Sequence, residues 1–227
     1  GVGYVLISNL VASSVKLLLL IPDILAAFRS RFDKSLFRKI LKYSYPLLIA
    51  GLAGTVNEAL DRVLLKHMIP LEQNPMEQLG IYGANYKLAV LMTLFIQMFK
   101  YAAEPFFFSK SGEKDARKLY ADVMMFFVVA GLFIFLLVNL YLDYFVLFIG
   151  SDFREGVQIV PVVLMANLVM GIFFNLSIWY KLTNLTKYGA VLVLLGAMIT
   201  VLINTLFIPV YGYTASAWAH LFCYSVM

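Results

Sequence analysis

The side chains that could do chemistry in this sequence are charged residues placed inside long apolar segments. One group of four lies within a single segment: Asn57, Glu58, Asp61 and Arg62. Glu58 and Arg62 are four residues apart and share a helical face, whereas Asp61 lies about 100° around the helix from Arg62. At ~1.5 Å per residue, Glu58 lies about 15 Å from Met68, near mid-membrane. Because a charge there costs roughly 2.5–3.5 kcal/mol on insertion scales, we expect an ion pair that ties helices together or side chains that face a cavity.

Lys87 is the second candidate, since no acid lies within one helical turn of it. With the membrane boundary near Gly80, Lys87 lies about 10 Å deep. Such a cation is expected to face water or an anionic ligand, or else to extend its stem back to the interface. Lys100 and Glu104 are again four residues apart, and we predict an interfacial ion pair between them.

No pattern of catalytic residues accompanies these charges. Nucleophile–base pairing, metal-ligand spacing and a glycine-rich phosphate loop are all absent from the sequence. His67 and His220 are far apart, and Cys223 is the only cysteine, so neither a cysteine metal cluster nor an internal disulfide is expected. We therefore predict a protein that is not an enzyme and that needs no metal or cofactor.

The composition is typical of a polytopic membrane protein. Of 227 residues, 62% are hydrophobic and 14% are charged, with a mean hydropathy of +0.86. A soluble domain of this size needs far more polar surface. The formal net charge is +5, but the basic residues flank apolar segments instead of forming one patch, which argues against a nucleic-acid partner.

The apolar segments approach the ~20 residues that a membrane span requires. Seven are predicted: Gly1–Ile21, Tyr43–Met68, Leu79–Phe108, Tyr120–Tyr141, Gly156–Tyr180, Tyr188–Pro209 and Tyr213–Met227, the last one cut short. The gaps between them are short, so neighbouring helices are expected to be antiparallel. The predicted fold class is an all-α polytopic membrane protein with about seven transmembrane helices.

Basic residues gather in the first, third and fifth gaps between these segments. The first gap holds Arg29, Arg31, Lys34, Arg38, Lys39 and Lys42, the third Lys110, Lys114, Arg117 and Lys118, and the fifth Lys181 and Lys187. The second gap has only acids, the fourth has one base among three acids, and the sixth has no charge. The positive-inside rule therefore places gaps one, three and five in the cytoplasm. Apolar residues recur among the bases of the first gap, which is expected to be an amphipathic helix or a solvated linker.

Several segments resemble bacterial polysaccharide-lipid flippases, the Wzx-type members of the multidrug/oligosaccharidyl-lipid/polysaccharide (MOP) exporter superfamily. Gly80–Ala89 and Lys100–Phe108 are similar to their eighth helix, and Asp61–Leu65 is similar to the end of their seventh. Trp179–Ala190 resembles the join of the tenth and eleventh helices, and Phe207–Ala219 the join of the eleventh and twelfth. The match covers almost the whole chain, and its specificity comes from the order and spacing of these segments.

The resemblance implies three parts. Residues 1–22 would be the last helix of an N-terminal lobe, residues 23–36 a cytoplasmic basic linker, and residues 37–227 a C-terminal six-helix lobe that is incomplete in its last helix. Members of the family alternate between inward-open and outward-open states and move undecaprenyl-pyrophosphate-linked sugars to the outer leaflet. The implied partners are a lipid-linked oligosaccharide, membrane lipids and the N-terminal lobe, in a bacterial cytoplasmic membrane.

The resemblance also implies a role for Lys87, since a basic residue at the matching position of related flippases helps to bind the anionic head group. Arg62 and Asn57 are further substrate-binding candidates because they lie deep within a predicted membrane span. Glu58 and Asp61 are the mid-membrane acids that could couple transport to H⁺ or Na⁺. The alternatives are a cation-coupled multidrug exporter of the same superfamily, a membrane-embedded glycan polymerase, and a scaffold without transport activity.

Overall fold

The computed structural model describes residues 2–28 and 33–227, and within this part of the chain every regular element is a helix. The long helices are α1 (Val2–Phe28), α2 (Lys34–Met68), α4 (Val90–Lys110), α5 (Ala116–Leu140), α7 (Val160–Leu176) and α9 (Thr186–Tyr211). The shorter ones are α3 (Pro75–Tyr86), α6 (Leu142–Phe145), α8 (Ile178–Leu182) and α10 (Tyr213–Val226). Single 3₁₀ segments cover Leu71–Gln73, Lys87–Ala89, Val146–Phe148 and Ser151–Ile159.

The chain divides into two compact units, Gly1–Lys42 and Tyr43–Met227. In the first unit, the backbone amides of Ser35 and Leu36 donate to Asp33 Oδ1 at 2.8 and 3.3 Å, so Asp33 caps the start of α2. The amphipathic stretch of the first gap therefore belongs to α2 from Lys34 onward. Gly1 and residues 29–32 lie outside the described residues, and with them Arg29, Arg31 and part of the predicted linker 23–36.

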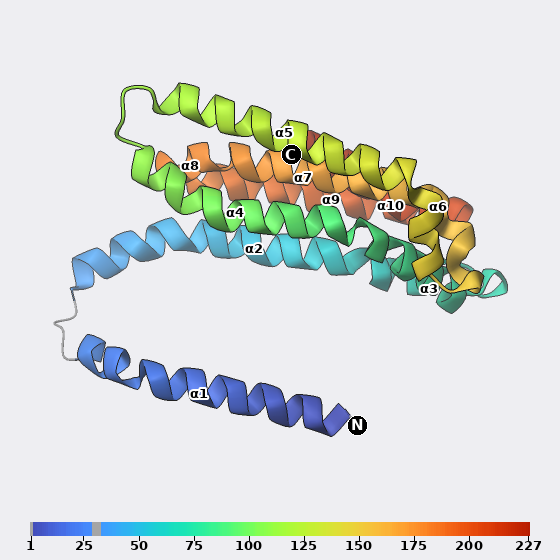
Figure 1. The fold of residues 1–227 in the computed structure, drawn as a ribbon, viewed down its shortest axis with the longest axis horizontal. Helices are drawn as coiled ribbons and strands as arrows, with labels where there is room; N and C mark the ends of the chain where they lie inside the picture. Colours follow the sequence, from blue (N-terminus) through green and yellow to red (C-terminus); the bar gives the residue numbers. More distant parts are fainter. Residues whose placement is uncertain (1, 29–32) are drawn as a thin grey trace. The chain divides into compact units, whose positions relative to one another are not determined.

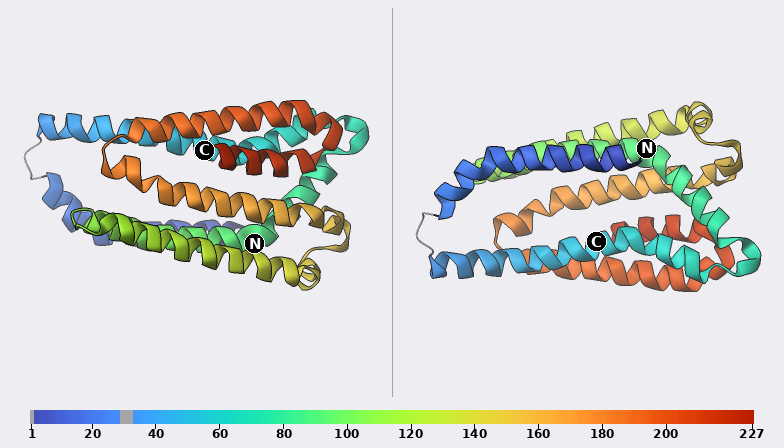
Figure 2. Two further views of the ribbon diagram at one scale, coloured as in Figure 1. Left: turned by 90° about the horizontal axis from the view of Figure 1, so that it is seen from above. Right: turned by 90° about the horizontal axis from the view of Figure 1, so that it is seen from below.

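Helix α7 is the centre of the second unit. It packs against α10 on one side and against α4 and α5 on the other, while α10 also packs along α9. The long helices of the second unit run side by side in Figure 1, and both views in Figure 2 show α7 between the α4–α5 pair and the α9–α10 pair. The core is formed by apolar side chains of α7, among them Val160, Val163 and Leu164, packed with residues such as Met92 and Phe127.

Five helical stretches are long and apolar enough to cross a membrane: Gly3–Leu25, Pro75–Lys110, Ala116–Leu140, Ser151–Leu182 and Thr186–Tyr211. The all-helical membrane fold is thereby confirmed. The two other predicted spans are also helical, but α10 has 14 residues and α2 carries several charges in its second half.

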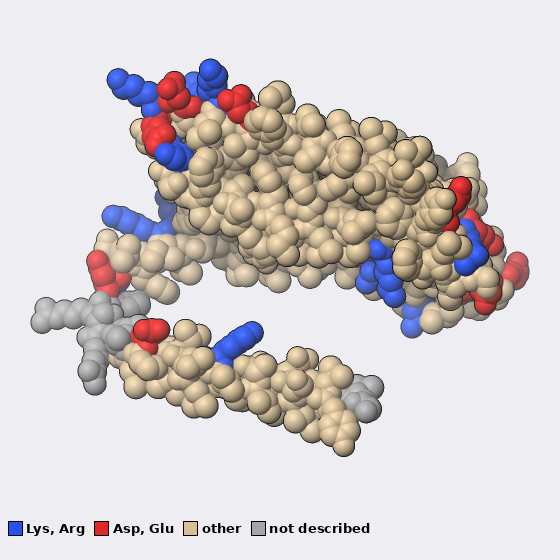
Figure 3. Space-filling model, in the orientation of Figure 1, with Lys and Arg blue, Asp and Glu red and all other residues tan. Residues whose placement is uncertain are grey.

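The surface of the second unit agrees with a lipid environment. On the face drawn in Figure 3, charged side chains gather toward the two ends of the helical bundle and leave an uncharged stretch between them. Large apolar side chains along α5, including Phe126, Phe133 and Leu136, are exposed. Exposed apolar residues of this kind suit lipid tails, because burying them against protein gives no hydrophobic gain in a bilayer.

Candidate functional site

Helix α2 sorts its four predicted site residues onto two faces. Asn57 and Asp61, one turn apart, are buried with side chains turned toward the other helices of the second unit. Glu58 and Arg62 follow one residue later and are exposed. In the described part of the chain no ion pair joins Glu58 to Arg62, so of the two alternatives left open for these charges the local ion pair is not formed.

Asp61 is the centre of a buried polar network. Its Oδ2 accepts a hydrogen bond from the hydroxyl of Tyr82 on α3 at 2.8 Å and lies 2.5 Å from Nε2 of His220 on α10. The other ring nitrogen of His220 lies 3.1 Å from the hydroxyl of Tyr224. Three helices therefore share one buried carboxylate–imidazole pair.

Sequence reasoning missed His220 because it tested the histidines only for metal-ligand spacing. The relevant signal is a titratable side chain inside an otherwise apolar or small-residue helix, which is expensive unless a partner exists. Asp61 is that partner, 159 residues away in the sequence.

Two buried acceptors in or beside this network have no hydrogen-bond partner among the described residues: Oδ1 of Asn57 and Oδ1 of Asp61. The Asn57 amide nitrogen lies 3.7 Å from Cys223 Sγ. A carboxylate oxygen such as that of Asp61 can take up a proton, and carboxylate and amide oxygens can both coordinate a small cation. No group of three or more His, Cys, Asp or Glu side chains that could hold a metal ion occurs among the described residues.

Lys87 lies at a break in the predicted segment Leu79–Phe108. A 3₁₀ turn, Lys87–Ala89, separates α3 from α4, and the Lys87 side chain is exposed. Within the described ranges no carboxylate pairs with Lys87. The preceding turn is fixed by Asn85, whose amide nitrogen donates to the carbonyls of Ile81 and Phe153 at 2.8 and 2.7 Å.

A cavity of about 570 Å³ lies within the second unit, with walls from α2, α4, α7, α8, α9 and α10. Of the predicted site residues it contains Asn57 and Glu58, whereas Asp61, Arg62 and Lys87 are not in its lining. Tyr224, the neighbour of His220, connects the Asp61 network to the cavity wall.

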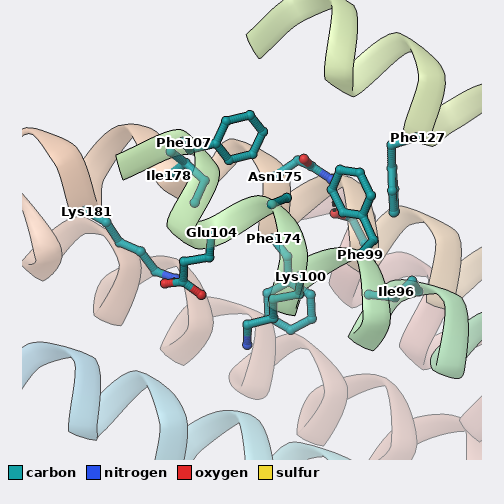
Figure 4. Close-up of a pocket in the computed structure, with 12 residues that line it drawn as sticks. Ile96, Phe99, Lys100, Glu104, Phe107, Phe127, Phe174, Asn175, Ile178 and Lys181 are labelled. Carbon is teal, nitrogen blue, oxygen red and sulfur yellow. Dashed lines mark hydrogen bonds and ion pairs between the residues drawn. The ribbon is translucent and has the colours of Figure 1, made fainter. Parts of the chain in front are cut away.

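Three further charged residues line the other end of the cavity. Lys181 on α8 pairs with Glu104 on α4, at 2.7 Å between Nζ and Oε1. Lys100 Nζ lies 4.5 Å from the centre of the Phe174 ring. The predicted ion pair between Lys100 and Glu104 is therefore wrong, because Glu104 turns to Lys181 (Figure 4).

The comparisons with known proteins support a transporter fold. Residues 1–111 match the family model described as "Polysaccharide biosynthesis protein". Two solved structures are similar to the chain: an outward-facing multidrug resistance MATE family transporter of the MOP superfamily, and a MOP superfamily transporter from Pyrococcus furiosus whose binding pocket is described as reversed in polarity. No curated protein matches the chain.

Each of these structures is 13% identical to the chain, with a TM-score of 0.66, and the match covers 83% of this chain. The chain spans 42% of the length of either structure. At this identity the likeness establishes the fold, and the family model adds the sequence signature. The protein is a multi-pass membrane protein with the fold of a MOP-superfamily transporter, and its resemblance to polysaccharide biosynthesis proteins is confirmed over residues 1–111.

Proposed function

We propose that the protein is part of a transporter that flips an undecaprenyl-pyrophosphate-linked oligosaccharide across a bacterial cytoplasmic membrane by alternating access. The cargo would be a repeat unit of O-antigen, capsule or exopolysaccharide. The observation that carries this proposal is the match of residues 1–111 to polysaccharide biosynthesis proteins, in a chain with a transporter fold and an internal cavity. A non-enzymatic role agrees with the transporter fold.

The charged residues fit an anionic cargo. A pyrophosphate passing through a medium of low dielectric needs cationic partners. Exposed Lys87 and Arg62 would supply them, and Asn57 on the cavity wall would offer its amide to the head group or sugar. One of the two acids, Asp61 or Glu58, would bind the H⁺ or Na⁺ whose gradient drives transport. Membrane lipids and the N-terminal lobe of a full-length transporter would complete the substrate path.

A cation-coupled multidrug exporter is the second candidate. Glu58 and Glu104 both line the cavity and could hold a cationic drug, and one similar structure is described as a multidrug resistance transporter. Lys100 and Lys181 line the same cavity and oppose a cationic ligand. We therefore place drug export second.

The test uses the full-length protein in its own cells. Undecaprenyl-linked oligosaccharide on the inner leaflet and glycan at the cell surface are measured for the wild type, a deletion strain and Lys87→Ala at matched expression. We expect the deletion to accumulate the lipid-linked precursor inside and to lose surface glycan, with at least about a tenfold defect for Lys87→Ala if one charge-assisted contact is lost. Lys114→Ala, on the exposed turn after α4, is the matched control and should transport normally. Normal surface glycan in the deletion strain together with new drug sensitivity would favour the exporter instead.

A further inference from the structure

The end of the cavity that holds Lys100, Glu104 and Lys181 has a local excess of positive charge. All three side chains line the cavity, and Figure 4 shows Glu104 turned toward Lys181 and Lys100 beside Phe174. Lys181 lies at the start of the fifth gap between the predicted spans. Lys100 lies ten residues before Lys110, the end of α4, and Lys110 belongs to the third gap. Since the positive-inside rule places both gaps in the cytoplasm, this is the cytoplasmic end of the cavity.

Two lysines and one carboxylate lie at this end of the cavity, and the carboxylate binds only one of the lysines. Glu104 binds Lys181, whose side chain is only 15% exposed, whereas the acceptor facing the Lys100 ammonium is the ring of Phe174. A cation–π contact stabilises an ammonium by only ~0.5–2 kcal/mol. Lys100 is thus held in a partly buried, largely aromatic wall without a carboxylate among the described residues.

Glu58, the other acid of the cavity, lies far along α2 from Lys181 and forms no ion pair with either lysine among the described residues. The Tyr43 hydroxyl lies 3.4 Å from the Lys181 carbonyl, so Tyr43 marks the level of Lys181 on α2. Glu58 follows Tyr43 by fifteen residues, a separation of about 22 Å along a helix. The two ends of the cavity are therefore electrostatically distinct.

We infer that Lys100 and Lys181 form a binding site for the phosphate groups of a lipid head group at the cytoplasmic mouth of the cavity, with Glu104 as the internal anion that the phosphate displaces from Lys181. Ammonium groups bind phosphate as point charges, and two of them suit a pyrophosphate. Glu104 keeps Lys181 paired while no head group is bound, since an unpaired buried cation is costly. A cavity of this size is also within the range of small-molecule sites.

The identity of the ligand rests on the proposed function. The two ammonium groups alone could hold either of two lipid phosphates. One source is the pyrophosphate of the transported lipid, and the other is the phosphate of an ordinary anionic phospholipid. The site differs from the one implied for Lys87, which lies outside the lining of this cavity.

The test is binding of undecaprenyl pyrophosphate and of phosphatidylglycerol to purified full-length transporter in zwitterionic nanodiscs. Lys100→Gln and Lys181→Gln are each expected to weaken pyrophosphate binding by about tenfold or more, as loss of a charge-assisted contact requires. Glu104→Gln is expected to tighten binding, because it removes the competing carboxylate while keeping the side-chain size. Lys110→Gln, which loses only an exposed pair with Glu113, is the matched control and should bind as the wild type does.

The gain in affinity for Glu104→Gln separates a binding role from a structural one, since misfolding would weaken binding in every variant. Unchanged affinity in Lys100→Gln, or weaker binding in Glu104→Gln, would overturn the inference. A preference for the pyrophosphate lipid assigns the site to the substrate, and equal affinity for phosphatidylglycerol assigns it to bulk lipid. The two proposals can fail separately. If both lysine variants bind normally while deletion of the gene still blocks glycan export, this site is refuted and the proposed function stands.

Discussion

At the scale of single residues, burial separates the two acids of α2. The Asp61 side chain is 2% exposed and contacts Tyr82 and His220, whereas Glu58 is exposed on the neighbouring face. Adding a proton or a cation to Asp61 changes the charge of a group in low dielectric, where the energetic effect is large. Glu58 lines the open cavity instead of the packed interior, so the energetic effect of the same event is smaller there. Asp61 is therefore the stronger candidate for ion coupling.

This difference predicts distinct behaviour of three variants in vesicles containing the full-length transporter. Asp61→Asn and His220→Gln should lose the response of transport to an imposed pH or sodium gradient, because each removes one member of the buried pair. Glu58→Gln should keep that response. Flux with and without each gradient is the measurement.

Stability provides the control for these variants. A lost hydrogen bond within a membrane protein costs on average ~0.6 kcal/mol and at most ~1.7 kcal/mol, so Asp61→Asn should remain folded with a slightly lower Tm. If Glu58→Gln abolished the gradient response while Asp61→Asn retained it, the exposed acid would be the coupling residue and the buried network a structural one.

At the scale of elements, the turn between α9 and α10 depends on Gly212. Its φ of +56° and ψ of −138° are disfavoured for residues with a Cβ, and an added Cβ would collide with Gln78 Oε1. The same Gln78 oxygen accepts a hydrogen bond from the Tyr213 amide at 3.2 Å, which joins α3 to the start of α10. The position therefore combines backbone strain with a close contact.

Gly212→Ala is accordingly expected to destabilise the protein by about 1–3 kcal/mol, the cost of a residue held in a sparsely populated backbone region. Gly83→Ala is the matched control, since Gly83 lies within α3 and an added Cβ meets nothing within 4 Å. It should leave stability unchanged or raise it by about 0.5–1 kcal/mol, the helix preference of Ala over Gly. Thermal unfolding in detergent measures both, and equal Tm values for the two variants would contradict the role of the turn.

The elements also show where sequence patterns stop being informative. Hydropathy located the helices, because span length and apolar content are local properties. It did not reveal the 3₁₀ turn at Lys87–Ala89, since Lys, Leu and Ala all favour helix. The turn follows Asn85, which bonds to Phe153 and packs beside Gly156 of a segment about seventy residues away. Contacts of that sequence separation leave no local signal.

The residues of the candidate site could be predicted from the sequence only in part. The charged residues of α2 and the isolated Lys87 were visible as breaks in apolar segments. The partners that give these charges their roles were not, because Asp61–His220 and Glu104–Lys181 join residues 159 and 77 positions apart. Helical spacing favoured the local pairs Glu58–Arg62 and Lys100–Glu104, and tertiary contacts replaced the second of them.

At the scale of the whole molecule, orientation in the membrane follows from charge and can be tested with introduced cysteines. Cys223, the cysteine of this sequence, is buried, so it should react little with a membrane-impermeant maleimide. Glu72→Cys lies in the second gap and Lys114→Cys in the third, both on exposed turns. The positive-inside rule places the second gap outside and the third in the cytoplasm.

In intact spheroplasts carrying the full-length protein, Glu72→Cys should therefore be labelled and Lys114→Cys should be protected until the membrane is permeabilised. Labelling of both after permeabilisation controls for expression and access. The reverse pattern would invert the transporter and place Lys100 and Lys181 at the outer mouth of the cavity. A phosphate site there would meet the lipid after flipping and not before it, so the direction in which the lysines act depends on this single topological result.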